Sequence, residues 1–577
     1  AASDVYKRQL DFLTKGLRFK ALGTFKNWSK SINKYSAGWN KYLLGSYEQN
    51  EDGSYSYTTN RVGNEVSTDL NSTNETAGDR RIYLEAMVDY NRTFGRHDVN
   101  AMLLYNQDEL VNNVPGNNLI NSLPKRKQGL AGRLSYAYDG KYMAEVNMGY
   151  NGSENFAKGH RWGFFPSIAL GYNISEESFF EPLRKVITSM KLRGSWGLVG
   201  NDQIGGERFI YMPTINLSGK GFTTGIDQNY GLSGPVYTRY ENNSITWEVG
   251  EKINLGIDLQ LLNSLNIVVD IFRETRRDIF QKKGTIPTYL GTGNTDVFGN
   301  LAEMKNQGLD LSIDYNKAFS KDFYMNFKGT FTYAHNEITK YDEAPKYAFQ
   351  SKVGQSANVS QGYLSNGLFL DEAEIDRYNQ QMGSTLGAGD IKYLNVSNMH
   401  GYGDDIVDVD DWTWIGNPTV PEIVYGFGPS FKYKNWDFSF FFQGVAKTSL
   451  FMSGFHPFGD NSLRNVLQFV ANDRWSPTNQ NVDAKYPRLT RKTSLNNTNP
   501  GNSGRTSDYW MRDGSFLKLK NMELGYTFKR MRFYISGSNL LTFSKFDLWD
   551  PEQGGGSGLK YPTQRVFNVG FQMTFNN

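Results

Sequence analysis

The sequence contains no cysteine, so the chain offers neither a disulfide framework nor a thiolate metal site. Hydrophobic residues make up only 38% of it, and none of its apolar runs is long enough for a membrane-spanning helix. A helical membrane protein is therefore excluded. A membrane β-barrel is not excluded, because the polar lumen face and the loops of a barrel dilute its average hydrophobicity.

Neither sign of charge predominates, because the chain has 62 Lys and Arg and 59 Asp and Glu, for a net charge of +3. The basic residues are spread along the chain, so nucleic acid is not an expected partner. The five histidines show no pair at metal-ligand spacing, and the sequence has no G-x-S-x-G, H-E-x-x-H or P-loop motif. We therefore expect no catalytic residue, no metal site and no cofactor, and we predict that the protein is not an enzyme.

What the sequence does have is aromatic residues, at 15%, and strict alternation of apolar and polar positions. The C-terminal stretch RVFNVGFQMTF places Phe567, Val569, Phe571 and Met573 on one face and polar or small residues on the other. The same pattern recurs in INLGIDLQL at 253–261, and a period of two is typical of strands. We count roughly eighteen such strands by this template. The best short helical candidate is 368–381.

Short and long connections between these strands take turns along the chain. Tight turns are expected at 93–98, 139–141, 261–266, 316–323, 432–437 and 528–533. Long loops are expected near 200–244, 337–420 and 445–515, with one of intermediate length near 277–303. In an up-and-down barrel all short turns fall on one rim and all long loops on the other, as in outer-membrane barrels, whereas a β-sandwich has no reason to alternate so regularly. The fold class predicted is an all-β, antiparallel, up-and-down transmembrane β-barrel. Its apolar face meets lipid and its polar face meets a wet lumen.

Several blocks also carry a family resemblance. They are LAGRLSYAYDGKYMAEVNMGYNG, MKLRGSWGLVGND, GNLAEMKNQGLDLSIDY, DGSFLKLKNMELGYTF and YPTQRVFNVGFQMTF. In this order, over most of residues 125–577, they resemble the barrel of SusC/RagA-type TonB-linked outer-membrane transporters (TonB-dependent receptors). The resemblance implies import of oligosaccharides or peptides across the outer membrane of a Bacteroidota cell. It also implies a SusD-like surface lipoprotein as a lid and energy from the TonB complex.

The chain departs from this family in two ways. Members carry an N-terminal plug domain and a TonB-contacting segment that this sequence does not show, and large transporter barrels have about 22 strands. We therefore expect a C-terminal fragment of such a barrel, with the TonB contact made by the missing N-terminal region. Residues 1–9 lack the alternation and are expected to be a non-native scar, which leaves 10–577 as the partial barrel. The three long loops are expected to be extracellular.

Two groups of loop residues are candidates for binding, although no substrate-binding residue is assigned. The acidic run at 404–411 offers carboxylates at short spacing, which suits Ca²⁺, but a solvated acidic turn is the favoured interpretation. Trp412, Trp414, Tyr509 and Trp510 offer rings that stack on sugars or that pack between loops. The GGGSG run at 554–558 predicts a flexible loop and not a phosphate cradle.

Two other functions remain open from the sequence. A passive porin would need neither plug nor TonB. A soluble β-rich glycan-binding or adhesin protein would bury the aromatic faces in a core and would need no detergent. The sequence does not identify the transported substrate, because the loops and the plug select it.

Overall fold

The computed structural model describes residues 2–116, 119–287, 289, 295–378, 386–454, 466–490, 496–497 and 506–575. Seventeen of its strands belong to one antiparallel sheet, close to the roughly eighteen predicted from alternation. The chain divides into two compact units, of which unit 1 comprises 1–92, 100–133 and 149–163, and unit 2 comprises 93–99, 134–148 and 164–577. The all-β fold class is confirmed.

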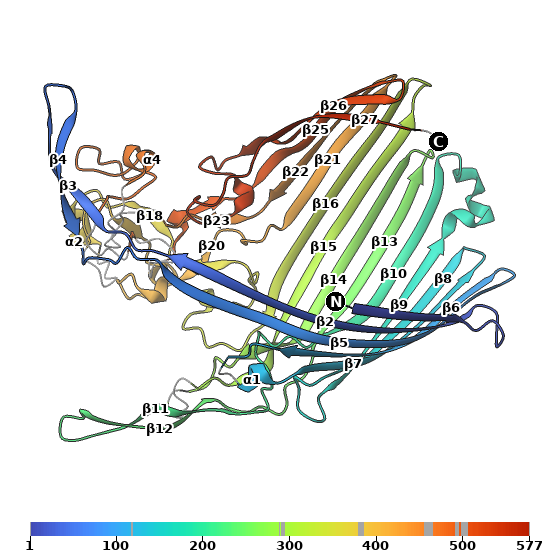
Figure 1. Ribbon diagram of the computed structural model, residues 1–577, viewed down its shortest axis with the longest axis horizontal. Coiled ribbons are helices and arrows are strands. Elements are labelled where there is room, and N and C mark those ends of the chain that lie inside the picture. Colours follow the sequence, from blue (N-terminus) through green and yellow to red (C-terminus); the bar gives the residue numbers. More distant parts are fainter. Residues whose placement is uncertain are drawn as a thin grey trace. The chain divides into compact units, whose positions relative to one another are not determined.

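Unit 1 holds the first strands of the sheet and parts of the strands that follow them. Its elements are β1 (Ala2–Gln9), β2 (Leu17–Ser36), β3 (Lys41–Gln49), β4 (Tyr55–Val62), β5 (Asn71–Phe94), β6 (His97–Asn112), α1 (Leu119–Ser122), β7 (Lys125–Tyr138), β8 (Tyr142–Ser153) and β9 (Trp162–Asn173), some of which extend into unit 2. The long strand β2 pairs with β5 over its whole length, from Leu17 opposite Tyr90 to Ser36 opposite Asn71. In Figure 1 the β3–β4 hairpin continues from this pair at one end.

The first residues differ from expectation, because Ala2–Gln9 is not separate from the fold. It forms β1 and pairs antiparallel with β2, from Ala2 opposite Phe25 to Gln9 opposite Arg18. An exposed strand edge presents unpaired backbone N–H and C=O groups, and any extended segment can satisfy them whatever its side-chain pattern. The lack of alternation therefore wrongly suggested that these residues lie outside the sheet. That these residues are a non-native scar stays a prediction.

Unit 2 continues the sheet with hairpins joined in chain order. Its sheet strands are β10 (Ile187–Asn201), β13 (Glu248–Leu261), β14 (Leu265–Lys282), β15 (Phe298–Ala318), β16 (Phe323–Lys340), β21 (Ile423–Tyr433), β22 (Trp436–Ala446), β25 (Phe516–Phe528), β26 (Met531–Ser544) and β27 (Val566–Met573). Strands β13 to β16 run side by side in Figure 1, in agreement with their pairing. The predicted tight turns join them. Between β13 and β14, Leu262 and Asn263 both take positive φ, of 50° and 54°, as a two-residue hairpin turn requires.

Each strand of unit 2 has an apolar face and a polar face, as the alternation predicted. Leu255 and Ile271, which pair across β13 and β14, are 62% and 59% exposed. On the opposite face, Arg193 donates hydrogen bonds to Asp258 at 2.8 Å and to Asp270 at 3.0 Å. One face of the sheet is thus apolar and exposed, and the opposite face carries ion pairs between strands. This arrangement fits a sheet with lipid on one side and water on the other.

The long connections of unit 2 contain short elements of their own. They are β11 (Thr214–Thr224), β12 (Tyr230–Arg239), η4 (Ala348–Gln350), β17 (Ser360–Gly362), β18 (Ser365–Leu368), α2 (Glu372–Arg377), β19 (Ile391–Tyr393), α3 (Val396–Met399), η5 (Val409–Asp411), β20 (Thr413–Ile415), β23 (Ser449–Phe451), α4 (Gln468–Asn472), η6 (Asp508–Trp510), β24 (Met511–Asp513) and η7 (Pro551–Gln553). The predicted short helix is confirmed as α2, capped by the Asp371 carboxylate, which accepts a hydrogen bond from Glu374 N–H at 2.8 Å. Residues 379–381 of that prediction lie outside the described residues.

The helices in the described part of the chain are all short. None of them has the length and apolar character that crossing a membrane demands.

Candidate functional site

The loops after β16 and β22 build a hydrophobic core of their own within unit 2. Tyr363, Tyr393, Met452 and Trp510 are fully buried in it. Burial of four such large side chains is worth several kcal/mol, at roughly 1.5–3 kcal/mol for each apolar side chain removed from water. These loops are therefore a folded layer, on which side chains can be held in place.

A buried charge network ties two distant parts of this layer together. Asp390 is fully buried and accepts hydrogen bonds from Arg488 Nη2 at 2.9 Å and from Asn497 Nδ2 at 2.6 Å. Burial lowers the pKa of the Arg488 guanidinium, but its pairing with Asp390 outweighs burial and raises that pKa overall. A buried carboxylate is stable only when it is paired in this way.

A cavity of about 690 Å³ lies between the loop layer and the polar face of the sheet. Gln443 and Val445 on β22 and Phe516 on β25 form its sheet side, because they share the polar face at the strand ends nearest the loops. The loop side is lined by Ser360, Thr419, Pro421, Thr448, Ser449, Leu450, Phe451, Ser453, Thr506, Gly514, Pro551, Glu552 and Gly554–Gly556. Hydroxyl, amide and backbone groups alternate there with apolar surface, a mixture that suits a polar, largely uncharged ligand.

Three glycines form one wall of this cavity, which the sequence did not reveal. Gly556 N–H donates to the Phe451 carbonyl at 2.8 Å, and Ser453 N–H donates to the Gly556 carbonyl at 2.8 Å. A Cβ at Gly555 would lie 2.6 Å from the Phe451 carbonyl oxygen, so only glycine lets the two backbones approach this closely. The run was predicted to be a flexible loop. The signal that could have located the wall is the succession of three glycines itself, which permits close backbone contact.

A lysine holds the neighbouring turn in place. Lys518 is 1% exposed and donates to Asp550 Oδ2 at 2.5 Å and to Glu552 Oε2 at 2.7 Å. Burial raises the pKa of both carboxyls, but hydrogen bonds outweigh it and keep each pKa below its usual value; they come from Lys518 and the Glu552 N–H to Asp550, and from Lys518 and Lys520 to Glu552. Both carboxylates are therefore ionised at neutral pH, and Glu552 adds one negative group to the cavity lining.

The four candidate aromatic residues do not form one binding surface. Trp510 is fully buried in the loop core, and Tyr509 donates its hydroxyl to the Ala484 carbonyl at 2.8 Å. Trp414 Nε1 donates to the Ser351 carbonyl at 2.9 Å. Trp412 is 37% exposed and packs edge-on against Tyr363. Packing between loops therefore accounts for three of the four rings, and Trp412 keeps a free portion.

The structure brings carboxylates of the acidic run together, with oxygens of Asp404, Asp408 and Asp410 within 4.8 Å of one another. Each has a local role. Asp404 accepts from Ile406 N–H at 3.2 Å, Asp408 caps η5 by accepting from Asp410 N–H at 2.8 Å, and Asp410 pairs with Lys346. Burial raises the pKa of the Asp404 carboxyl, but the bond from Ile406 N–H and other hydrogen bonds outweigh burial and lower it overall. The run therefore acts as a set of turn caps.

Asp411 departs from the predicted solvated turn, because it is fully buried. It accepts from Ser397 N–H at 2.9 Å and from Asp408 N–H at 2.8 Å. Burial raises the pKa of its carboxyl above the usual value. The run is thus partly a structural anchor that joins η5 to α3. The expected absence of a metal site stays a prediction.

A large antiparallel sheet with one exposed apolar face and one polar face is the arrangement of an outer-membrane β-barrel. The family model described as "TonB dependent receptor-like, beta-barrel" matches residues 2–540, and the chain belongs to this family. Proteins of this family reside in the outer membrane, and this chain is an outer-membrane protein.

Relatives support the same assignment. The chain is 25% identical over 574 residues to TonB-dependent receptor P3 of Formosa agariphila, covering 89% of this chain and 54% of the relative. It is 28% identical over 471 residues to TonB-dependent receptor SusC of Bacteroides thetaiotaomicron, covering 77% of this chain and 43% of the relative. The chain thus spans about half the length of the curated relatives it matches. In fold it is similar to a chain of the RagAB peptide transporter structure, with a TM-score of 0.70, 19% identity, and coverage of 99% of this chain and 61% of that one.

Proposed function

We propose that the complete protein imports oligosaccharides or peptides across the outer membrane, using energy delivered by the TonB complex. The observation that carries the proposal is the match to the TonB-dependent receptor family over residues 2–540. The fold shared with a chain of the RagAB peptide transporter structure supports peptides, and the resemblance of the sequence blocks to SusC/RagA-type transporters supports both substrate classes. A SusD-like surface lipoprotein acts as the lid over the loop layer.

The cavity beneath the loops supplies a place for part of the substrate. Its hydroxyl, amide and backbone groups offer both donors and acceptors, as sugar hydroxyls and peptide bonds require, and its apolar side chains exclude water. Among the described residues that line it, Glu552 alone carries a charge, so we expect binding not to depend on a strongly charged cargo.

Filling this cavity is expected to reduce uptake by the complete protein. Val445→Trp places a large side chain into it and takes space and contacts from the substrate, so a loss of about 1.4 kcal/mol or more of binding free energy should lower uptake at low substrate concentration by about tenfold or more. The measurement is uptake of labelled oligosaccharide and peptide pools by cells that make the complete protein and its lid. Phe438→Trp, on the apolar face of the same strand, is the matched control and should leave uptake near wild type.

The same cells distinguish active import from a passive porin. Deleting the host's TonB should abolish uptake by the wild-type protein. Uptake that persists without TonB would establish the porin and refute the proposed import. The soluble adhesin hypothesis does not agree with an outer-membrane location.

The direction of the barrel is tested by protease added to intact cells. If the long loops face outside, cleavage should occur within 337–420 or 445–515, parts of which lie outside the described residues, and should spare the turns at 432–437 and 528–533. The lid should be absent, because a closed lid would protect the loops. Cleavage confined to the tight turns would invert the proposed topology.

A further inference from the structure

Unit 1 carries a hollow of about 410 Å³ on its apolar face, at the strand ends from which the longer connections leave. We call it the rim hollow. Its lining comes from β5 to β9 and from the ends of the β8–β9 connection. The residues are Ile82, Leu84, Gln107, Asp108, Glu109, Arg126, Lys127, Gln128, Gly152, Ser153, Glu154, Arg161 and Trp162. All of them belong to unit 1.

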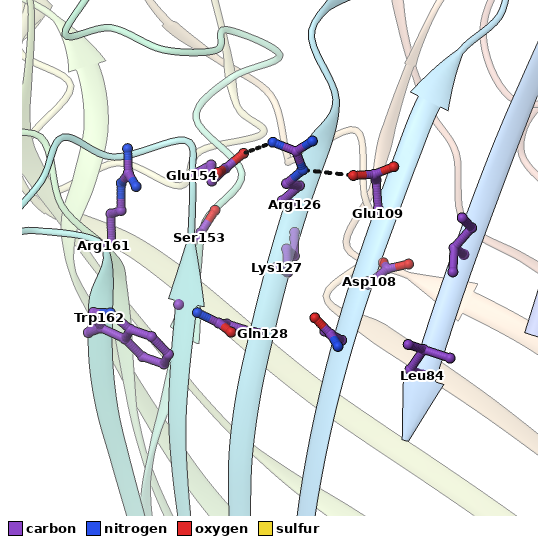
Figure 2. Close-up of a pocket in the computed structure, with 13 residues that line it drawn as sticks. Leu84, Asp108, Glu109, Arg126, Lys127, Gln128, Ser153, Glu154, Arg161 and Trp162 are labelled. Atoms are coloured by element: carbon purple, nitrogen blue, oxygen red, sulfur yellow. Dashed lines mark hydrogen bonds and ion pairs between the residues drawn. The ribbon is translucent and has the colours of Figure 1, made fainter. Parts of the chain in front are cut away.

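A row of charged side chains bounds the hollow toward the strand ends. Arg126 Nε donates to Glu109 Oε2 at 2.7 Å, and its Nη1 lies 4.0 Å from Glu154 Oε2. Figure 2 shows Arg126 between these two carboxylates, with Gln128 and Trp162 further along the strands. Because Glu154 N–H bonds the Arg126 carbonyl, this row crosses three neighbouring strands directly.

The next row inward forms the floor and one wall. The indole of Trp162 lies flat on Gly152, where an added Cβ would be 3.1 Å from the ring. It also stacks on Tyr150, with ring centroids 4.7 Å apart and an angle of 14° between planes. Gln128 accepts a hydrogen bond from Tyr105 Oη at 3.2 Å. The missing side chain at Gly152 leaves room for the indole of Trp162 to lie against the neighbouring strand.

The hollow marks the level at which the outward face changes from polar to apolar. Beyond Gln128 on the same face of β7 comes Leu130, and Tyr105 and Tyr150 are exposed on the adjacent strands, at 42% and 44%. Exposed Trp and Tyr rings on the lipid-facing side of a membrane barrel gather at the headgroup level. Any molecule in the rim hollow therefore reaches into the headgroup layer of the membrane.

The chemistry of the lining indicates the class of occupant. On the face that carries the hollow, strand alternation places the carboxylates of Glu109 and Glu154 and the guanidinium of Arg126, whereas Asp108 binds Arg81 on the opposite face through two hydrogen bonds, of 2.6 and 2.9 Å. Because Arg126 pairs with both carboxylates, the row disfavours a metal ion or an isolated phosphate. Interleaved donors and acceptors suit hydroxyl groups, and the indole of Trp162, which is 43% exposed, offers apolar aromatic surface to the C–H groups of a pyranose ring.

We propose that the rim hollow binds the saccharide headgroup of a membrane glycolipid, whose acyl chains lie along the apolar face beside Leu130 and Tyr105. A free oligosaccharide would offer the same sugar chemistry. The position of the hollow on the lipid-facing side favours the lipid-borne sugar, since the acyl chains then cover apolar surface that lipid must cover in any case. This site is separate from the cavity of the proposed import function, and the proposal rests on the outer-membrane location and on the orientation proposed above, with the long connections outside.

The test uses the complete protein, purified in detergent, with rough-type lipopolysaccharide as the probe. Native mass spectrometry counts the lipopolysaccharide retained, against phosphatidylglycerol and against the same saccharide stripped of its acyl chains. Wild type should retain lipopolysaccharide about tenfold better than Trp162→Ala, because an aromatic contact of this kind is worth up to about one decade in affinity. Gly152→Leu, whose side chain would displace the Trp162 ring, should lose retention equally. Phe571→Leu, on the apolar face of β27, which contributes nothing to the lining, should behave as wild type.

Three results would overturn the proposal. They are unchanged retention in both Trp162→Ala and Gly152→Leu, equal retention of phosphatidylglycerol by the wild type, or binding of the stripped saccharide as tight as that of the intact glycolipid. Heat-modifiable migration on gels confirms that each variant is folded. If Trp162→Ala fails to fold, Gln107→Ala takes its place, since it removes a polar group from the hollow and leaves the aromatic stack intact.

Discussion

Replacing Phe571 by arginine is expected to reduce assembly of the complete protein far more than replacing its neighbour Gln572. Phe571 lies on the apolar face of β27, 56% exposed beside the ring of Phe533, with ring centroids 5.2 Å apart. Arginine on the lipid face near the midplane costs about 2–4 kcal/mol, because the charge leaves water for hydrocarbon. Gln572 lies on the polar face, where a guanidinium stays hydrated.

The surroundings of Gln572 favour the same outcome. It pairs with Arg532 in the register of β26 and β27, and Arg532 already binds Asp437 and Glu523. Two carboxylates against one guanidinium leave local negative charge that can accommodate a second arginine. The measurement is the fraction of heat-modifiable, folded protein in outer-membrane fractions.

The control for this pair is Phe571→Leu, which keeps the apolar face and should assemble nearly normally. Equal assembly of the two arginine variants would show that the faces are assigned wrongly. Poorer assembly of Gln572→Arg than of Phe571→Arg would show that the polar face is packed inside protein.

Arg488→Ala is expected to unfold the loop layer while leaving the sheet intact. The substitution leaves the buried Asp390 carboxylate without its charged partner, and removal of one partner of a buried ion pair typically lowers stability by about 3–5 kcal/mol. The layer has its own core, so the loss should appear locally, as is usual for separately stabilised parts of a protein. Hydrogen exchange of the backbone N–H groups of Ile391 and Tyr393 should rise by two to three orders of magnitude, since each 1.4 kcal/mol is about tenfold.

An exposed ion pair in the same layer supplies the matched control. Lys485 is 73% exposed and lies 3.5 Å from Asp473, and exposed pairs contribute only about 0.2–1 kcal/mol. Lys485→Ala should therefore leave hydrogen exchange nearly unchanged. If Arg488→Ala and Lys485→Ala behaved alike, Asp390 would be adequately satisfied by Asn497 and the backbone, and the pair with Arg488 would not hold the layer together.

Pattern alone predicted most of the sheet, because the side-chain period of a strand is visible in the order of residues. The tight turns at 139–141 and 261–266 followed from the same alternation, and so did the exposed apolar face of β27. The side-chain pattern did not predict the strand Ala2–Gln9. Its pairing with β2 depends on an available strand edge, which cannot be read from a side-chain pattern.

The side-chain pattern did not predict the buried ion pair of the loop layer or the rim hollow. Asp390 and Arg488 are 98 residues apart, and neither their spacing nor their neighbours mark them as partners. Glu109, Arg126 and Glu154 form a row only because of the strand register, and Gly152 accommodates the Trp162 ring only because the next strand places that ring across it. Local alternation is a property of a single strand, so the sequence by itself determined strands, faces, turns and family. Register, loop packing and cavities depend on contacts between distant segments, whose energies are comparable for many alternative pairings, so only the tertiary structure decided them.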